Sequence, residues 1–182
     1  MNPPMAPVAL TSQEMKDLPA IRDAGRSRHA GPTARDFAEA IVGEDRRAFY
    51  IDEENRGRGT ASTAEADKGG RTYAVRTRAD LLVVDSDSAD PGPVTQLFGE
   101  VLAGGFGPVL TESGRPGHRH LLGVLPPDAM ARFRGRAAEL GAGDDRTGRS
   151  IRPPLAPHRL GLPTRILHPD TPHKALDALQ RR

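Results

Sequence analysis

The hydrophobic pattern is clearest in the middle of the chain. Residues 81–84 form a compact apolar run, which is typical of a buried strand, and a short acidic segment follows it. Between Pro93 and Gly104, apolar side chains recur every three or four positions, at residues 94, 97, 98, 101 and 102. This spacing places them on one face, so it predicts a helix.

Downstream, the pattern predicts a hairpin, a second helix and a last strand. Residues 107–111 and 119–125 are short apolar segments separated by a polar turn that contains glycines, which is the layout of a β-hairpin. A helix begins near Pro127, because apolar residues then recur at positions 130, 133, 137 and 140. Residues 149–152 are a short strand candidate, ended by two prolines.

The predicted order from residue 81 is strand, helix, strand, strand, helix, strand. This is the split β-α-β arrangement of ferredoxin-like and RNA-recognition-motif-like (RRM-like) folds. The predicted fold class is therefore α+β, with a palm in which two helices back an antiparallel sheet. In such a sheet the first strand ends beside the hairpin, so we expect Asp85 and Asp87 to lie near residues 113–120.

The part of the chain before this palm predicts a small α/β subdomain. Thr33 with Asp36, and Ser62 with Glu65, have the spacing of capping boxes, which mark the start of helices. Residues 72–75 suggest a strand.

These patterns divide the chain into four parts. We place the N-terminal α/β part at residues 33–76, the palm at residues 77–168 and a C-terminal helix at residues 169–182. Residues 1–32 contain five prolines and only a weak helical pattern, around residues 11–22, so we expect a mobile arm.

Composition narrows the class of protein. A chain of 182 residues suffices for one domain, with or without a short subdomain. It has no cysteine, which excludes disulfides and thiolate zinc sites. No apolar run approaches the roughly 20 residues of a membrane span, and the proline-rich start lacks the apolar core of a signal peptide. We expect a soluble, cytoplasmic protein with no membrane partner.

Charge is distributed unevenly. Residues 76–110 carry 2 Lys and Arg against 5 Asp and Glu, whereas residues 111–182 carry 13 against 7. A basic segment after an acidic one suits a site for metals and phosphates, because metals require carboxylates and polyanions require arginine. A GC-rich genome would also enrich arginine, so the clustering matters more than any single Arg.

Three polar clusters are candidates for chemistry, and the first is Asp85-Ser86-Asp87. Alternation along a strand sends both carboxylates to the same side, where they repel each other unless a cation lies between them. Magnesium and manganese suit such a pair, and two-metal nucleotidyl transfer uses one ion to activate the 3′-oxygen and the other to stabilise the leaving pyrophosphate. A turn after a strand explains the same residues equally well.

The second cluster is the polar, glycine-containing segment 111–121. Its glycines let backbone amides approach an anion, and Ser113 adds a hydroxyl donor. Arg115, Arg119 or His120 could neutralise the charge of a triphosphate. It contains no Walker loop, and an ordinary hairpin loop with solvated bases is the alternative.

The third cluster combines acids, bases and prolines in residues 144–161. Asp144 or Asp145 could supply a third carboxylate, and arginines here have the fork geometry that suits phosphates. A rigid proline-bracketed connection is the alternative, and it explains the prolines but not the concentration of His and Arg. The basic residues are Arg146, Arg152, His158 and Arg159.

Together these clusters resemble the primase-polymerase branch of the archaeo-eukaryotic primase superfamily. That family has an acidic D-x-D motif, a Ser/Gly-rich stretch that ends in His, and an acid followed by a base, often with a Pro-Pro-containing His loop beyond. The resemblance covers roughly residues 70–165 and lies in the joint occurrence of the motifs. The matching positions are Asp85-Ser86-Asp87, Ser113-Gly114 to His120 (or His118), and Asp144 (or Asp145) with Arg146, then Pro153-Pro154 and His158.

The resemblance implies a DNA primase/polymerase that transfers (d)NTPs on a single-stranded DNA template, in the replication of a plasmid, phage or integrative element. Asp85, Asp87 and Asp144 would be catalytic and would bind two Mg²⁺ or Mn²⁺ ions, with Asp145 as the alternative to Asp144. Priming would need a helicase or a template-binding partner protein. The residues that would bind the nucleotide are Ser113, Gly114, His120, Arg146, Arg152, His158 and Arg159.

Two other functions fit some of these residues. His118-Arg119-His120 resembles the H-x-H metal pair of rolling-circle nickases, which need a tyrosine nucleophile; the only tyrosines are Tyr50 and Tyr73. A non-catalytic module that binds single-stranded nucleic acid on the same fold is the second alternative. RNA-binding versions display aromatic residues on the sheet, and aromatic residues are scarce in this chain.

Overall fold

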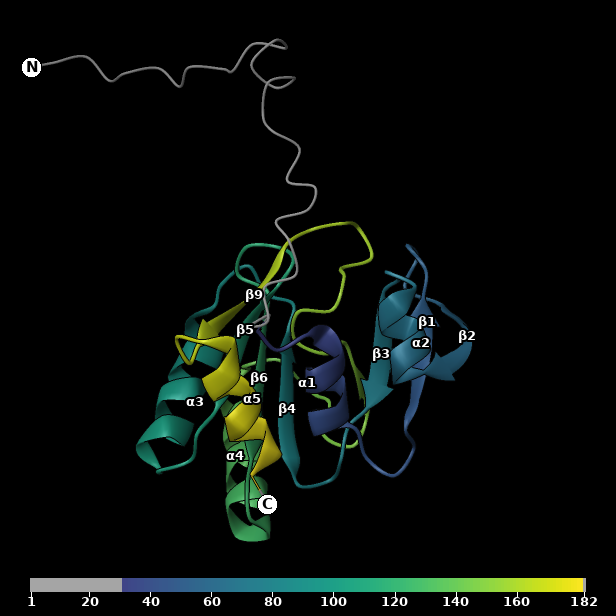
Figure 1. The fold of residues 1–182 in the computed structure, drawn as a ribbon. Coiled ribbons are helices and arrows are strands. Elements are labelled where there is room, and N and C mark those ends of the chain that lie inside the picture. Colours follow the sequence, from purple (N-terminus) through teal and green to yellow (C-terminus); the bar gives the residue numbers. More distant parts are fainter. Residues whose placement is uncertain (1–30, 182) are drawn as a thin grey trace, which may run out of the picture. The chain divides into compact units, whose positions relative to one another are not determined.

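The computed structural model describes residues 31–181, and this part of the chain has five helices and nine strands in two antiparallel sheets (Figure 1). The mixed α+β class is confirmed. The arm expected at residues 1–32, with its weak helical pattern, lies outside the described residues except for its last two positions. None of the described helices is long and apolar enough to cross a membrane.

A five-stranded sheet forms the centre of this unit. Its strands lie in the order β7-β4-β6-β5-β9, and every neighbouring pair is antiparallel. The strands are β4 (Leu81–Ser86), β5 (Val109–Ser113), β6 (Arg119–Val124), β7 (Asp144–Asp145) and β9 (Thr164–His168).

Both faces of the central sheet are buried, which explains the unbroken apolar run of β4. Leu82 and Val84 belong to a core shared with α3 (Gly92–Ala103) and α4 (Pro127–Leu140). Their neighbours Leu81 and Val83 point the other way, into a second core shared with α1 (Ala34–Ile41) and α5 (Pro172–Gln180). Figure 1 shows α5 and α1 over this second face.

A four-stranded sheet lies beside the first. Its order is β2-β1-β3-β8, again antiparallel throughout. Ala48, Tyr73 and Val75 point from this sheet into the core that contains α1 and the buried Ala66 of α2. The remaining elements are β1 (Arg47–Ile51), β2 (Gly57–Ser62), α2 (Thr63–Lys68), β3 (Tyr73–Arg76) and β8 (Ser150–Ile151).

Local signals in the sequence account for most of these elements. Both predicted capping boxes are present, at the start of α1 and of α2. The predicted hairpin is β5–β6, the two amphipathic patterns are α3 and α4, and the strand expected at residues 72–75 is β3. A helix, α5, lies in the C-terminal segment where one was expected.

The last strand of the expected palm was placed wrongly. Residues 149–152 were expected to complete the central sheet, but β8 pairs with β3 in the four-stranded sheet instead. The neighbour of β4 at that edge is β7, which lies only four residues after α4. Strand β8 pairs with β3 because Ile151 is buried next to Val75 there. Nothing within residues 149–152 specifies which of the two sheets offers that contact.

Candidate active site

A cleft of about 520 Å³ opens between the two sheets. Most of the predicted site residues line it, but Asp144 and Gly114 do not. One wall comes from the ends of β4, β5 and β6, and the other from β1, β3 and β8. The residues predicted for the site that line it are Asp85, Asp87, Ser113, His118, His120, Arg146, Arg152, His158 and Arg159.

The centre of this cleft is a cross-strand pair between Asp85 and His120. The β4–β6 register sets these two residues directly opposite each other, so their side chains share a face. His120 Nε2 lies 3.2 Å from Asp85 Oδ1, and both side chains are largely buried. The pair fixes the direction of the Asp85 carboxylate.

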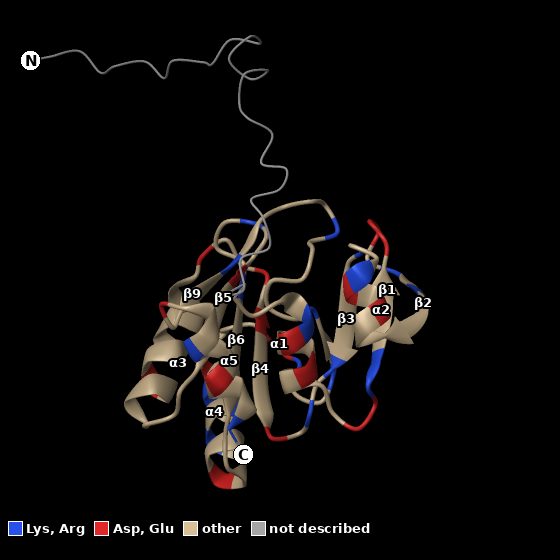
Figure 2. Ribbon diagram, viewed as in Figure 1, with Lys and Arg blue, Asp and Glu red and all other residues tan. Residues whose placement is uncertain are grey.

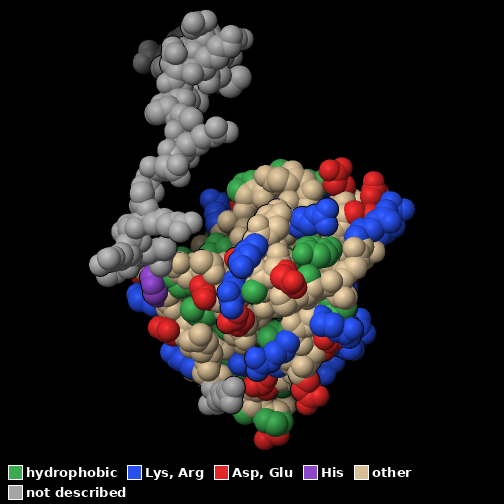
Figure 3. All heavy atoms as spheres, turned by 45° about the vertical axis from the view of Figure 1, so that its right-hand side comes forward, with side chains coloured by type: hydrophobic (Ala, Val, Ile, Leu, Met, Phe, Trp, Pro, Cys, Tyr) green, Lys and Arg blue, Asp and Glu red, His purple; other side chains and the backbone are tan. Residues whose placement is uncertain are grey.

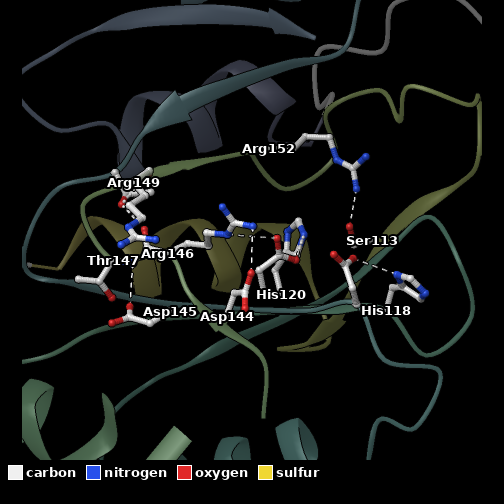
Figure 4. A network of polar contacts seen from close by, with 12 residues as sticks. Ser113, His118, His120, Asp144, Asp145, Arg146, Thr147, Arg149 and Arg152 are labelled. Carbon is white, nitrogen blue, oxygen red and sulfur yellow. Dashed lines mark hydrogen bonds and ion pairs between the residues drawn. The ribbon is translucent and has the colours of Figure 1, made fainter. Parts of the chain in front are cut away.

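The β4–β7 register places the two candidate third acids on opposite faces of the sheet. Asp144 lies opposite Asp85 and therefore on its face. Arg146 joins the two acids, with its Nη2 at 3.2 Å from Asp144 Oδ2 and its Nε at 3.7 Å from Asp85 Oδ2. Asp145 points to the opposite face, where it pairs with Arg134 of α4 at 2.6 Å. Figure 4 shows Asp144, Arg146 and His120 pointing toward one another.

Gly143 makes this register possible. A Cβ atom there would lie 2.5 Å from the carbonyl oxygen of Asp85, and the backbone φ of 139° is one that side-chain-bearing residues rarely adopt. Glycine thus lets the short strand β7 approach β4 and bring Asp144 to Asp85.

The second acid of the D-x-D motif is placed differently. Asp87 lies just beyond β4, its side chain is 82% exposed, and its Oδ1 lies 3.1 Å from His118 Nδ1. Both histidines of the H-x-H sequence therefore contact an aspartate, His120 inside the cleft and His118 near its mouth. Arg119 lies between them on the other face of β6 and is not part of the cleft lining.

The proline-rich loop between β8 and β9, residues 152–163, contributes Arg152, His158 and Arg159 to the cleft lining. Arg152 Nη2 donates to Ser113 Oγ at 2.5 Å. A Cβ atom on Gly114 would meet the His158 ring at 2.6 Å, so glycine there lets His158 lie on the β5–β6 turn. Arg159 donates to the backbone carbonyl of Glu53, which ties this loop to the β1–β2 hairpin.

Charge in the cleft favours an anionic ligand. Four arginines line it against two aspartates. Figure 2 shows a basic position on the loop before β9 and others on the β1–β2 side. Burial lowers the pKa of Arg152 to about 10, although Asp85 opposes that shift. Burial also lowers the pKa of His158 to about 4, with the charges of Arg152 and Arg159 acting in the same direction. A bound polyanion would place negative charge next to both groups and so counteract the lowering of their pKa values.

Asp85 stays ionised in this setting. Burial by itself raises the pKa of its carboxyl. The hydrogen bond with His120 and the positive charges of Arg146 and Arg152 outweigh that effect, so the pKa lies below its usual value. An ionised carboxylate in a cationic cleft has the chemistry to bind a divalent cation.

The donor set fits a magnesium or manganese ion that is bound together with phosphates. Within residues 31–181, no group of three or more His, Asp or Glu side chains is arranged to hold a metal ion by itself. Mg²⁺ does not require one, because it keeps several waters and is commonly held by one or two carboxylates plus substrate phosphates. Asp85 lines the cleft and Asp144 lies opposite it on the same face of the sheet, so these two would form such a pair, and the cationic side chains of the cleft would hold the phosphates.

The other wall of the cleft was not predicted. Ile51, Asn55, Thr72 and Ala74 come from the four-stranded sheet and its hairpin, and Ser150 comes from β8. A weak signal existed, because Thr72 and Ala74 belong to the predicted strand at residues 72–75. Nothing in the sequence indicated that this strand would face the acidic motif.

Comparison with known proteins identifies no relative of this chain. The sequence matches no protein-family model, and neither a curated protein nor a solved structure shows significant similarity to it.

Proposed function

We propose that this chain is a metal-dependent nucleotidyltransferase, a DNA primase/polymerase that adds (d)NTPs on a single-stranded DNA template. The observation that carries the proposal is that acidic and basic side chains from separate segments of the chain converge on one cleft. The ionised Asp85 lies in a cleft lined by basic residues from four separate segments, and the strand register places Asp144 opposite Asp85 on the same face of the sheet. These basic residues are Arg115 and His118 from the β5–β6 turn, His120 from β6, Arg146 from the turn after β7, and Arg152, His158 and Arg159 from the loop before β9.

Each group has a role that its position supports. Arg146, Arg152 and Arg159 bind the triphosphate, and Ser113 and the backbone of its turn add donors. Asp85 and Asp144 hold the divalent cation, with Asp87 at the mouth as a further carboxylate. When bound, the metal ions supply activation of the attacking 3′-oxygen and stabilisation of the leaving pyrophosphate. His120 keeps the Asp85 carboxylate oriented toward the cleft.

The topology supports an RRM-like palm for this site. From β4 onward the chain runs strand, helix, strand, strand, helix, strand, ending at β7. The spatial order β7-β4-β6-β5 places the first and third of these strands in the centre, as a split β-α-β arrangement requires. The proposed palm differs from the one expected from sequence only in its last strand, and β9 extends it at the other edge.

The nickase alternative is weaker, because it requires a tyrosine nucleophile beside the histidine pair. Tyr73 is fully buried in the core next to α1 and α2. Tyr50 packs against the same core and lines a neighbouring groove rather than the cleft that contains His118 and His120. Neither hydroxyl therefore belongs to the cleft. A non-catalytic binding module would use the same basic rim but would have no need for the Asp85–Asp144 pair.

The test is synthesis on single-stranded DNA with labelled nucleotides, with and without a primer, in Mg²⁺ or Mn²⁺. The wild type should make product only with a metal ion present, and the double variant Asp85→Ala/Asp87→Ala should make none. Absence of wild-type product with either metal and with both dNTPs and NTPs would reject the proposal, as would equal activity of the double variant. Replication of a plasmid, phage or integrative element, with a helicase or template-binding partner, remains part of the proposal that rests on the resemblance.

A further inference from the structure

The four-stranded sheet has one covered face and one open face. Ala48, Tyr73 and Val75 point into the core with α1 and α2. Their alternate neighbours in the same strands point away from that core. We call this second side the open face; the cross-strand registers place on it Arg47, Phe49, Thr60, Ser62, Ala74, Arg76 and Ser150.

Phe49 lies at the centre of the open face. It is directly opposite Thr60 on one side and Ala74 on the other. It is only half-buried and packs against neither of the two apolar cores. The guanidinium carbon of Arg47 lies 6.0 Å from the centre of its ring. This aromatic ring belongs to neither apolar core and is partly exposed, with a guanidinium as its charged neighbour.

The charge around Phe49 is positive. Arg47 and Arg76 are exposed at these strand positions, and no strand position assigned to the open face is acidic. Asp45, in the loop before β1, holds Arg47 through a hydrogen bond of 2.8 Å. Figure 3 turns this side of the molecule forward and shows Lys and Arg side chains interspersed with Asp and Glu side chains and small apolar areas.

The open face runs into the candidate active site. Ala74, next to Phe49 across the β1–β3 pair, also lines the cleft, and so does Ser150, which pairs with Arg76. A nucleic-acid strand bound on the open face would therefore lead directly to the cleft that contains Asp85. A basic sheet with one central aromatic ring suits a chain of phosphates with unpaired bases, since every base can stack and every phosphate attracts arginine.

We propose that the open face binds the single-stranded template, with one unpaired base stacked on Phe49 and the backbone held by Arg47 and Arg76. This inference rests on the proposed function, because it names where the template lies relative to the nucleotide cleft. It also places template contacts on the N-terminal part of the chain, although the excess of basic residues in the sequence lies in residues 111–182.

The test is the affinity of a fluorescein-labelled oligo(dT) strand, measured by anisotropy. Phe49→Ala should weaken binding about tenfold, since one base–aromatic stack contributes about 1–3 kcal/mol, and Phe49→Tyr should restore it. Arg47→Ala should reduce the slope of log affinity against log salt by about 0.7. Arg35→Ala is the matched charge control, because Arg35 is exposed and paired with Glu39 on α1. Phe98→Ala, on α3, is the aromatic control.

One further measurement, together with the outcomes of the oligo(dT) assay, separates this inference from the proposed function. Binding of a fluorescent dATP analogue with Mg²⁺ should be unchanged in Phe49→Ala, because the ring does not line the cleft. Equal oligo(dT) affinity of wild type and folded Phe49→Ala would overturn the inference, even if the enzyme synthesises DNA. Loss of oligo(dT) affinity in Phe49→Ala but not in Phe98→Ala would support it, even if the wild type makes no product.

Discussion

At the scale of single residues, the pKa of His158 is the property that should respond most directly to an anion bound in the cleft. Its pKa of about 4 reflects burial and the neighbouring charges of Arg152 and Arg159. Because this value is lower than the usual one of 6.5, the folded protein binds fewer protons than the unfolded chain between about pH 6.5 and pH 4. His158 therefore lowers the stability of the fold as the pH falls through this window and has no effect above it.

A bound triphosphate should reverse this behaviour by supplying negative charge next to the imidazole. We predict that nucleotide binding raises the pKa of His158, so that the wild type gains affinity for Mg²⁺-dATP relative to His158→Gln as the pH falls from about 7.5 to about 5.5. Titration calorimetry at several pH values measures the ratio of the two affinities. Protonation of the phosphates affects both proteins equally, so a ratio independent of pH would contradict an anion at His158.

At the scale of secondary-structure elements, the approach of β7 to β4 is the feature on which the site depends. Strand β7 has only two residues, and one of them is Asp144. Its position depends on Gly143, which has no room for a side chain beside the Asp85 carbonyl.

We predict that Gly143→Ala lowers stability by about 2 kcal/mol more than Gly148→Ala and abolishes synthesis. Gly148 is the matched control, because it also has a positive φ, of 68°, but a Cβ atom there would meet nothing within 4 Å. Thermal unfolding and the synthesis assay measure the two effects. Equal destabilisation by the two substitutions would show that the close approach of β7 to β4 is unimportant.

Elements with strong local signals were the ones that the sequence could predict. Capping boxes, amphipathic periods and the glycine-containing turn specify α1, α2, α3, α4 and the β5–β6 hairpin. Strand β2 was missed because its residues are almost all exposed, so no alternation marks it. Strand β8 was assigned to the wrong sheet because two residues cannot encode which partner they pair with.

At the scale of the whole described unit, the proposed function requires the two sheets to share one cleft. The acidic motif and the basic clusters were predictable because each is contiguous in sequence. Which of Asp144 and Asp145 lies on the same face as Asp85 depends on strand register, which the sequence left open. The wall formed by Ile51 and Thr72 was not predictable, because it depends on how one sheet lies beside the other.

The proposed function assigns metal-dependent nucleotidyl transfer to the face of β4 that carries Asp85. Asp145 offers a close control, because it is also partly buried, is paired with an arginine and has a lowered pKa, yet lies on the opposite face. Nucleotide incorporation on a primed single-stranded template should fall about 1000-fold in Asp85→Asn and less than about threefold in Asp145→Asn. Thermal unfolding curves should show that both variants are folded. Equal losses in the two variants, or full activity of Asp85→Asn, would contradict the claim.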